Sequence, residues 1–445
     1  MGPDTDARQE LTLQPVLISQ LCFILNTYLA LNPRLFHLRL YLLPITLHSL
    51  WYLCTHFAFS DPTLNSYNFG LCSVGATIAI QVLQLGALSE PPRYDGKLAC
   101  VRRREDHGVV CWGCVVNTGS YLMDPRYLHW NSRGVRHVPD DTRRDGSHAE
   151  FYADTLVRFL KHGLYVDFLL AFVMNLTTSG SIKRDTVFRD TFAITSNFTI
   201  HVPHPFLGAL PLTIAAGFLI MNILALEHYL VTLLAAPAVW FSLPASSLKK
   251  EWPPLFDHPS RATCLRDFWT NRWQGSTRRY FAFAGGRPGS VVGGYAGQAV
   301  GKFVGPLSTP SKWENKLRLV GSRMGYVLGT FFVSGLIHDF GTWGMGQGMD
   351  LRRVTGYFVI QGVGVILESA LGLDKGLVDD GKGSHGFQTS ALYRCLKKVW
   401  VPLWIVLPAT MMIEAWIKRG FAFVANDYSP SMALFGVWNE FAFGK

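Results

Sequence analysis

Long apolar runs constrain this chain more than any other feature. Eight of them approach the roughly 20 residues that a helix needs to cross about 30 Å of hydrocarbon. They cover residues 11–31, 36–58, 68–88, 163–179, 206–225, 320–341, 354–373 and 399–417. Only 16% of the 445 residues are charged, against about 25% in an ordinary soluble domain. The sequence therefore predicts an all-α, polytopic integral membrane protein.

The apolar stretch 226–241 leaves the number of spans open. Glu227, His228 and Pro237 interrupt it, so it is a further span, a re-entrant piece or a helix lying in the interface. We therefore expect eight to ten transmembrane helices.

Two polar segments separate groups of apolar runs and set the predicted orientation. Residues 242–318 contain twelve Lys or Arg and four acids, which by the positive-inside bias places them in the cytosol, and 89–162 follow the same bias. The predicted division is into N-terminal membrane helices (1–88), a polar cytosolic segment (89–162), membrane helices with a luminal turn (163–241), a basic cytosolic segment (242–318) and C-terminal membrane helices (319–445).

The luminal turn contains a glycosylation signal. Asn197-Phe198-Thr199 is an acceptor sequence for N-glycosylation, which occurs only on the luminal side, and it favours the endoplasmic reticulum. The net charge of 41 − 31 = +10 suits an anionic membrane face or an acidic co-substrate. We expect no nucleic-acid partner, because the basic surplus lies between apolar runs without a zinc-finger, RRM or basic-zipper pattern.

Metal and redox chemistry have weak support. The eight cysteines are too few and too scattered for a secreted disulfide scaffold. Cys111 and Cys114 form a CxxC without a second pair, so two buried thiols are the favoured interpretation. The Gly-rich patch at 285–305 has neither a GxGxxG nor a Walker pattern and is interpreted as a flexible insertion. We predict neither a metal nor a resident cofactor, and the sequence does not indicate an oligomeric state.

A histidine beside an aspartate lies in the apolar run FFVSGLIHDF (331–340). Burial disfavours the charged imidazole, so His338 keeps a lone pair for general-base work. The alternative is a histidine that only hydrogen-bonds a neighbouring helix, and its position alone does not separate the two. Asp339 orients the ring or faces elsewhere, since adjacent helical side chains diverge by ~100°.

Aromatic residues alternate with arginines before that run. EWPPLF (251–256) is followed by LRDFWTNRWQ (265–274) and RRYF (278–281). On a helix, Phe268, Trp269, Arg272 and Trp273 share one face. Such a segment lies at the headgroup level and offers guanidinium groups to phosphates, or it is an interfacial anchor without a ligand.

These motifs, in this order, resemble the wax synthase branch of the membrane-bound O-acyltransferases, particularly its fungal members that acetylate terpenoid and meroterpenoid alcohols. The resemblance covers roughly residues 250–340. It implies helices around a central chamber, in which an acyl group passes from acyl-CoA, acetyl-CoA in the fungal members, to a hydrophobic alcohol. His338 falls on the active-site histidine of the family. The chain departs from the family at Gln274, where His or Asn is common, which puts an acid or base role there in doubt.

The resemblance implies direct transfer, with His338 taking the proton of the alcohol as its oxygen attacks the thioester. Asn271 or Gln274 would donate to the oxyanion, and Arg272, Arg278 and Arg279 would meet the CoA phosphates. The expected binding residues are Trp269, Asn271, Arg272, Trp273, Gln274, Arg278 and Arg279.

Three other functions remain open at this stage. A wax ester synthase would use long-chain acyl-CoA. A transporter would use the intramembrane ionisable groups Glu227, His228 and Glu368, although paired halves are not recognisable. A prenyltransferase or terpene cyclase would use the DDxxxD of 140–145 for magnesium, but a solvated charge cluster explains that motif better.

Overall fold

The structure is a computed structural model. It describes residues 8–92, 112–123, 137–178, 186–188, 190–195, 198–239, 245–304, 310–374, 391–421 and 431. It confirms a helical, membrane-protein fold, with two short strand pairs in the described residues. The chain forms two compact units, one of residues 1–257, 341–348 and 413–445, and one of residues 258–340 and 349–412.

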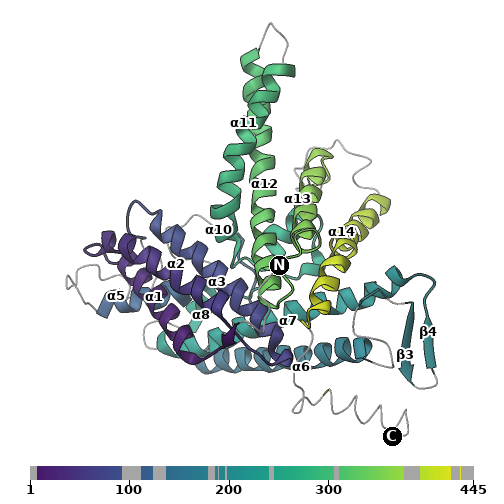
Figure 1. Cartoon of the computed structure of the whole chain (residues 1–445), viewed down its shortest axis with the longest axis horizontal. Helices are drawn as coiled ribbons and strands as arrows, with labels where there is room; N and C mark the ends of the chain where they lie inside the picture. The colour runs from purple at the N-terminus through teal and green to yellow at the C-terminus, as the bar shows by residue number, and fades with distance from the viewer. Residues whose placement is uncertain are drawn as a thin grey trace. The chain divides into compact units, whose positions relative to one another are not determined.

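The first unit contains the N-terminal helices and a long helix pair (Figure 1). Its elements are β1 (Gln9–Glu10), α1 (Leu13–Leu31), η2 (Phe36–Leu38), α2 (Arg39–His56), β2 (Phe57–Ala58), η3 (Pro62–Leu64), α3 (Asn65–Gly86), α5 (Trp112–Met123), α6 (His148–Thr178), β3 (Thr191–Thr195), β4 (Phe198–His201), α7 (Pro205–Val239) and α8 (Ala245–Glu251).

The second unit contains the FWxxRW motif and His338. Its elements are η4 (Pro259–Arg261), α9 (Leu265–Asp267), the π-helical turn η5 (Phe268–Arg272), α10 (Arg278–Phe281), the π-helical turn η6 (Ala282–Gly286), α11 (Arg287–Val304), α12 (Pro310–Gly344), α13 (Val354–Ala370) and α14 (Ala391–Lys418). The last turn of α12 and the end of α14 belong to the first unit.

All eight apolar runs lie in helices. Five helical segments in the described residues are long and apolar enough to cross a membrane, and α13 is a shorter apolar helix. The five are Leu13–Leu31, Pro62–Gly86, Pro205–Pro237, Lys312–Gly344 and Val399–Lys418. The chain is an integral membrane protein by these helices. The total of eight to ten spans and the five-part division stay predictions.

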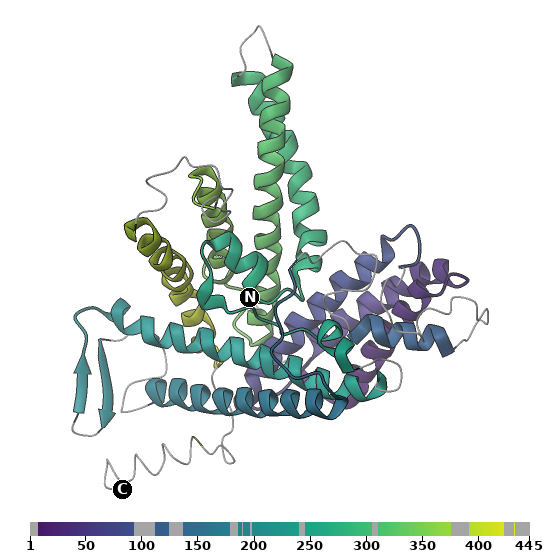
Figure 2. The same ribbon diagram turned by 180° about the vertical axis from the view of Figure 1, so that it is seen from behind.

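The structure describes the stretch 226–241 as far as residue 239. Residues 226–239 continue α7, which runs for 35 residues without a break at Glu227 or His228. α6 and α7 pack as a long antiparallel pair with the β3–β4 hairpin between them (Figure 2). Thr191 and Ile200 fall in these strands, where β-branched residues are common. The predicted helix hairpin is therefore present, with a small β hairpin in its turn.

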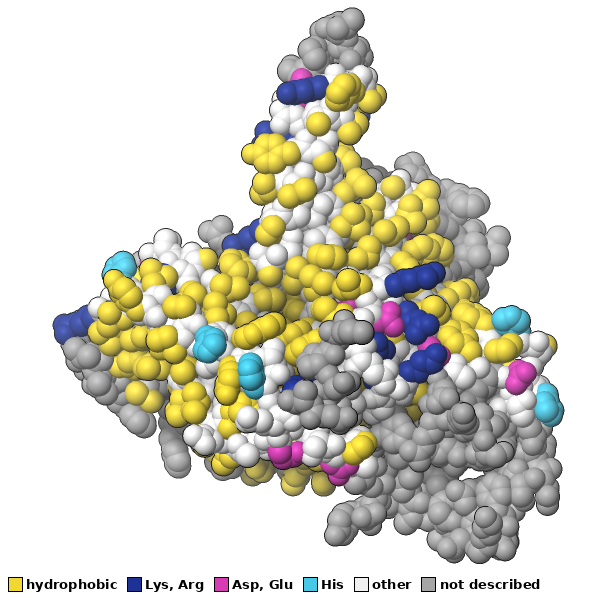
Figure 3. Space-filling model, viewed as in Figure 1, with side chains coloured by type: hydrophobic (Ala, Val, Ile, Leu, Met, Phe, Trp, Pro, Cys, Tyr) yellow, Lys and Arg dark blue, Asp and Glu magenta, His cyan; other side chains and the backbone are white. Residues whose placement is uncertain are grey.

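The surface of the helices is apolar where a soluble protein would be polar. Leu13, Tyr41 and Trp51 of α1 and α2 are 69%, 77% and 59% exposed. Asn26 and Thr46 of the same helices are buried and hydrogen-bond backbone carbonyls. Apolar side chains cover much of the face in Figure 3. This distribution is expected where lipid, not water, is the solvent.

The Gly-rich patch is not a flexible insertion, so that prediction is wrong. Its glycines fall every four residues on one side of η6 and α11, and they pack backbone to backbone on α12. A Cβ on Gly289 would lie 2.2 Å from the carbonyl oxygen of Gly325, and a Cβ on Gly293 would lie 2.2 Å from that of Gly321. Small residues at four-residue spacing allow such close helix contact, and this periodicity was the missed signal.

Candidate active site

His338 lies in α12 with its ring held in one orientation. Nδ1 lies 2.7 Å from the carbonyl oxygen of Ser334, one turn earlier in the helix. A carbonyl oxygen only accepts, so Nδ1 carries the hydrogen and Nε2 carries the lone pair of the neutral ring. The half-buried ring also stacks on Phe358 of α13, with centroids 4.3 Å apart. In this tautomer Nε2 is the basic nitrogen of the neutral ring, and the stacking on Phe358 fixes the plane of the ring.

The printed hydrogen bonds of the Asp339 carboxylate go to the turn after α12 and to α13, which favours a structural role for it over orienting the imidazole. The carboxylate is fully buried and accepts hydrogen bonds from the backbone N–H of Asp350 (2.6 Å) and the hydroxyl of Thr355 (2.8 Å). It therefore fixes the turn between α12 and α13. The neighbouring Gly335 allows the close approach of these helices, because a Cβ there would lie 2.8 Å from the Cα of Thr355.

The FWxxRW motif forms a π-helical turn in place of the predicted α-helix. The N–H of Trp273 donates to the carbonyl of Phe268 at 2.7 Å, a five-residue step. Phe268 stacks on Trp273 with centroids 5.4 Å apart, and Trp269 meets both rings edge-on. π-helical turns are frequent at functional sites. The aromatic side chains thus gather as predicted, but through a different helical step.

Trp269 joins the motif to the helix of His338. Its ring packs edge-on against Phe331 of α12, with centroids 5.6 Å apart. Phe331 precedes His338 by seven residues, which is two helical turns or about 10 Å along the same side of α12. The indole Nε1 of Trp269 is buried and has no hydrogen-bond partner within the part of the chain that the structure describes. It is an available donor on the side of α12 that carries His338.

Asp267 organises the polar side chains of the motif. Its carboxylate accepts from the Nδ2 of Asn271 (3.0 Å) and the Nε of Arg272 (2.7 Å). Burial raises the pKa of Asp267, but the hydrogen bonds from Arg272 and Asn271 outweigh it, and the net pKa lies below the usual value. Asp267 was not among the residues predicted from the sequence, although the i,i+4 spacing from Asp267 to Asn271 is a signal for such a contact.

The remaining predicted binding residues follow the π-helical turn. Gln274 donates from Nε2 to Thr277, and its Oε1 accepts from Ser276, so its amide closes a local turn. Arg278 donates to the carbonyl of Thr270 at 2.9 Å. Arg279 lies beside it in α10. The structure therefore brings all seven predicted residues into one segment, and Arg272, Gln274 and Arg278 take part in contacts within it.

Glu368 anchors this segment to α13 and α14. Its buried carboxylate accepts from the backbone N–H of Leu265 (2.9 Å) and from the indole of Trp400 (2.9 Å). The carboxylate thus fixes the start of α9, directly before the motif. These contacts give Glu368 an anchoring role, which removes its support for the transporter alternative. This role could not be predicted from the sequence, because the partners are about 100 and 30 residues away.

One family of known proteins matches the part of the chain that contains this candidate site. Residues 252–360, which contain the FWxxRW motif and His338, match the profile of the membrane bound O-acyl transferase family. This segment, about a quarter of the chain, is similar to that family.

Two curated proteins resemble the chain over part of its length. An O-mevalon transferase of Penicillium terrestre is 28% identical over 171 residues, which is 37% of this chain and 35% of the relative. A putative long-chain-alcohol O-fatty-acyltransferase of Arabidopsis thaliana is 29% identical over 124 residues, which is 28% of this chain and 31% of the relative. The chain thus spans about a third of the length of the curated relatives it matches.

Just beyond the matched segment 252–360, α13 contributes a buried polar group that was not predicted from the sequence. Gln361 is fully buried and donates from Nε2 to the carbonyl of Trp404 at 3.0 Å. Its Oε1 has no hydrogen-bond partner among the described residues. Gln361 lies one turn after Phe358, which stacks on His338. A buried glutamine in an apolar helix was the available signal.

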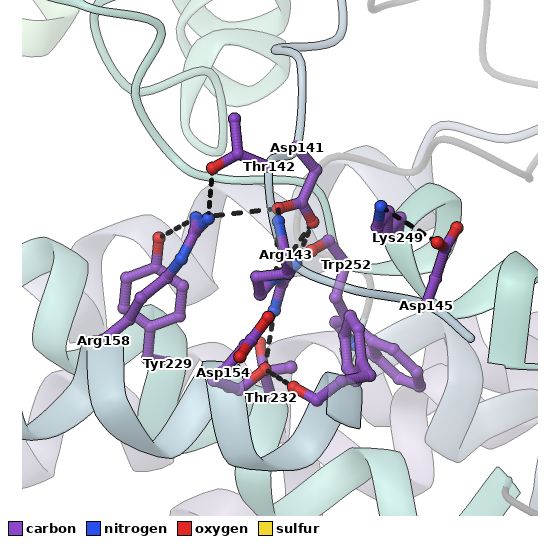
Figure 4. A network of polar contacts seen from close by, with 12 residues as sticks. Asp141, Thr142, Arg143, Asp145, Asp154, Arg158, Tyr229, Thr232, Lys249 and Trp252 are labelled. Carbon is purple, nitrogen blue, oxygen red and sulfur yellow. Dashed lines mark hydrogen bonds and ion pairs between the residues drawn. The ribbon is translucent and has the colours of Figure 1, made fainter. Parts of the chain in front are cut away.

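The DDxxxD of 140–145 is not a solvated cluster, so that prediction is wrong for its central residues (Figure 4). Arg143 is 1% exposed and donates to both carboxylate oxygens of Asp141, at 3.1 and 2.8 Å from Nε. Arg158 lies 3.6 Å from the same carboxylate, and Lys249 lies 3.2 Å from that of Asp145. Cations already neutralise these acids, which disfavours a magnesium role for the motif.

Two predicted features lie wholly or partly outside the described residues. Asn197 is outside them, so the glycosylation site stays a prediction. Cys111 is also outside them, whereas Cys114 lies in α5 and is half-buried. In the described residues, no three His, Cys, Asp or Glu side chains are grouped as metal ligands.

Proposed function

We propose that the chain transfers the acyl group of an acyl-CoA to a hydroxyl of a hydrophobic alcohol. The proposed donor is acetyl-CoA, and the proposed acceptor is a terpenoid or meroterpenoid of fungal secondary metabolism. The observation that carries the proposal is the geometry of His338, whose Nδ1 donates to Ser334 and leaves Nε2 to act as the base. The family match over 252–360 supports the reaction class.

In the proposed reaction, Nε2 of His338 removes the proton of the alcohol while the alcohol oxygen attacks the thioester carbonyl. The tetrahedral intermediate then collapses, and the C–S bond breaks. The proton returns from His338 to the departing thiolate, which gives an ester and coenzyme A. No acyl-enzyme is needed, and exclusion of water protects the thioester from hydrolysis.

The other residues have proposed roles in holding the substrates. The Nε1–H of Trp269 is a buried donor that would meet a carbonyl or oxyanion, and the Oε1 of Gln361 is a buried acceptor that would meet a hydroxyl or amide N–H. Arg278 and Arg279 would meet the CoA phosphates. Arg272 would act through Asp267, which orients the π-helical turn.

A long-chain wax ester synthase is the second candidate. One relative is named a putative long-chain-alcohol O-fatty-acyltransferase, and it is about as similar as the fungal one. Both candidates share the base and the reaction and differ in the substrate chains. Location in the endoplasmic reticulum is part of both proposals and is supported by the Asn197 sequon.

The test is to supply membranes containing the full chain with radiolabelled acetyl-CoA or palmitoyl-CoA and a panel of terpenoid and long-chain alcohols. We expect an acetyl ester of a terpenoid alcohol, and none from membranes with His338→Ala at equal expression. A palmitoyl ester of a long-chain alcohol would support the second candidate instead. Absence of any ester with the whole panel, or an active His338→Ala variant, would contradict the proposal.

A further inference from the structure

Two cysteines of the first unit converge from neighbouring helices. Cys54 lies in the last turn of α2, and Cys72 lies in the first half of α3. The Sγ of Cys72 lies 3.7 Å from the carbonyl oxygen of Cys54, and the Sγ of Cys54 lies 3.7 Å from that of Leu71. The sulfur of Cys72 therefore points at Cys54, and the sulfur of Cys54 points at Leu71, the residue before Cys72.

The surrounding chain holds the pair in this position. Cys54 and Cys72 are 2% and 0% exposed. A Cβ on Gly75 would lie 2.6 Å from the Sγ of Cys54, and a Cβ on Gly344 would lie 2.6 Å from the Sγ of Cys72. Both glycines thus make room for a sulfur atom.

A buried guanidinium adjoins the pair. Arg8 is 9% exposed, donates to the carbonyl oxygen of Gly344 at 2.5 Å, and lies 5.7 Å from the ring centroid of Trp343. It interacts electrostatically with both cysteines. Its Nε and NH1 atoms are buried and have no hydrogen-bond partner among the described residues. A buried cation of this kind stabilises a nearby anion, and a thiolate is the anion that Cys54 or Cys72 can supply.

The predicted topology places this end of α2 and α3 in an oxidising compartment. α3 leads into the segment 89–162, which the charge bias places in the cytosol. The start of α3 and the end of α2 then lie on the luminal side. Disulfides form and persist in the lumen of the endoplasmic reticulum, whereas cytosolic thiols stay reduced.

We propose that Cys54 and Cys72 form a disulfide that ties α2 to α3. A thiolate of the pair, stabilised by Arg8, attacks a disulfide of a thiol–disulfide oxidant and releases one oxidant thiol. The other cysteine then attacks the mixed disulfide and releases the second. The chain loses two electrons and two protons, and the oxidant disulfide takes them up and becomes two thiols. This inference does not depend on the proposed acyltransferase reaction.

Differential alkylation of the full chain from its own membranes tests the disulfide. Free thiols are blocked under denaturing conditions with light N-ethylmaleimide, and the chain is then reduced and labelled with the heavy reagent. We expect heavy label on Cys54 and Cys72 and light label on Cys22, a half-buried free cysteine of α1. Light label on both Cys54 and Cys72 would overturn the proposal. In Cys54→Ser, Cys72 should become light, and heavy label there would show a different pairing and equally overturn it.

A second measurement tests the part assigned to Arg8. The chain and Arg8→Gln are equilibrated in glutathione buffers of graded potential and alkylated as before. Arg8 stabilises the thiolate and so favours the reduced pair, in the way that a stabilised reduced form makes a disulfide more oxidising. In Arg8→Gln the disulfide should therefore persist into more reducing buffers. An unchanged midpoint, or a shift in the opposite direction, would contradict the assignment.

Discussion

The two long helix pairs of this protein are held together in opposite ways. In the first unit, α6 and α7 meet through side chains: His162 donates from Nδ1 to Asn222 at 2.7 Å, and Arg158 donates to Tyr229. In the second unit, α11 and α12 meet through bare backbone, with the Cβ position of Gly285 lying 2.0 Å from the carbonyl of Gly329. The α6–α7 pair therefore depends on particular polar side chains, whereas the α11–α12 pair depends on glycines, which have no side chain.

This difference bears on the active site. α12 is fixed on one side by the glycines of α11 and on another by the Gly335 contact with α13, and His338 lies one turn beyond Ser334 in the same helix. Backbone contacts cannot adjust by rotating a side chain. We therefore expect substitutions in the α11–α12 pair to disturb the position of His338, and substitutions in the α6–α7 pair to affect stability alone.

The largest loss of stability is expected for Arg143→Ala, which removes buried side-chain contacts of the first unit. Arg143 reaches the hydroxyl of Thr155 in α6, packs over Phe151 and neutralises Asp141. Its loss leaves a buried carboxylate whose nearest remaining cation is the more distant Arg158, besides the backbone N–H of residue 143, a defect that costs about 3 kcal/mol. Thermal unfolding in detergent measures it. The double variant Asp141→Asn, Arg143→Met should be less destabilised, and equal loss in both would show that packing and not charge sets the effect.

The next largest loss of stability is expected for Gly325→Ala, which disturbs the backbone contact between α11 and α12. The added methyl would lie 2.0 Å from the carbonyl oxygen of Gly289, so the helices must separate at a cost of about 3 kcal/mol. Esterification should fall as well, because α12 carries His338. The matched control is Gly217→Ala in α7, where nothing lies within 4 Å and alanine favours the helix by about 0.5 to 1 kcal/mol. Similar stability of the two variants would refute the distinction between the pairs.

A smaller loss of stability is expected for Asn222→Ala in α7. The side chain bonds His162 and the carbonyl of Phe218, and its removal leaves a ring N–H without that acceptor, at a cost of about 1 to 2 kcal/mol. Its counterpart in the other pair is Ser290→Ala, which removes the 2.6 Å contact with Ser322. Thermal unfolding should show less change for Ser290→Ala, since the glycine contacts persist. A larger loss there would mean that hydrogen bonding also governs the α11–α12 pair.

The smallest effect is expected on the stability of the chain at low pH. Hydrogen bonds from Arg144 lower the pKa of Asp154 in α6 to about 2, against an ordinary 3.8. The pair therefore stabilises the chain above pH 3.8 and loses this contribution as the pH falls through about 2. Asp154→Asn should lower the unfolding temperature at neutral pH only slightly, since an ion pair near the surface contributes less than about 1 kcal/mol, and should flatten the acid limb of the stability profile. An unaltered acid limb would show that other groups determine it.

Much of the fold could be predicted from the sequence because one periodic signal governs it. Runs of apolar residues near 20 in length fix the helices whatever their partners are, and all eight runs lie in helices. The glycine pairing was missed because a composition-based interpretation treats glycine as flexible, and only its four-residue spacing shows the shared face. The burial of Arg143 was missed because a run of charges looks solvated unless its partners in α6 are known.

The candidate site could be predicted only where its signal is local. His338 and the FWxxRW residues stand in short motifs, and the orienting Ser334 lies four residues before the histidine. The contacts of Glu368 and Gln361 join distant segments, so a single sequence gives no pattern for them. The π-helical turn was also out of reach, because its pattern of residues is compatible with an ordinary α-helix.

The most direct measurement is alcohol-dependent release of coenzyme A by the purified full chain and by His338→Gln. The glutamine fills most of the ring volume but lacks a base of comparable strength. The account predicts a loss of at least about 100-fold, the lower end of what a general base contributes, with unfolding temperature unchanged. Release within about threefold of the original chain, at equal folded protein, would contradict His338 as the base.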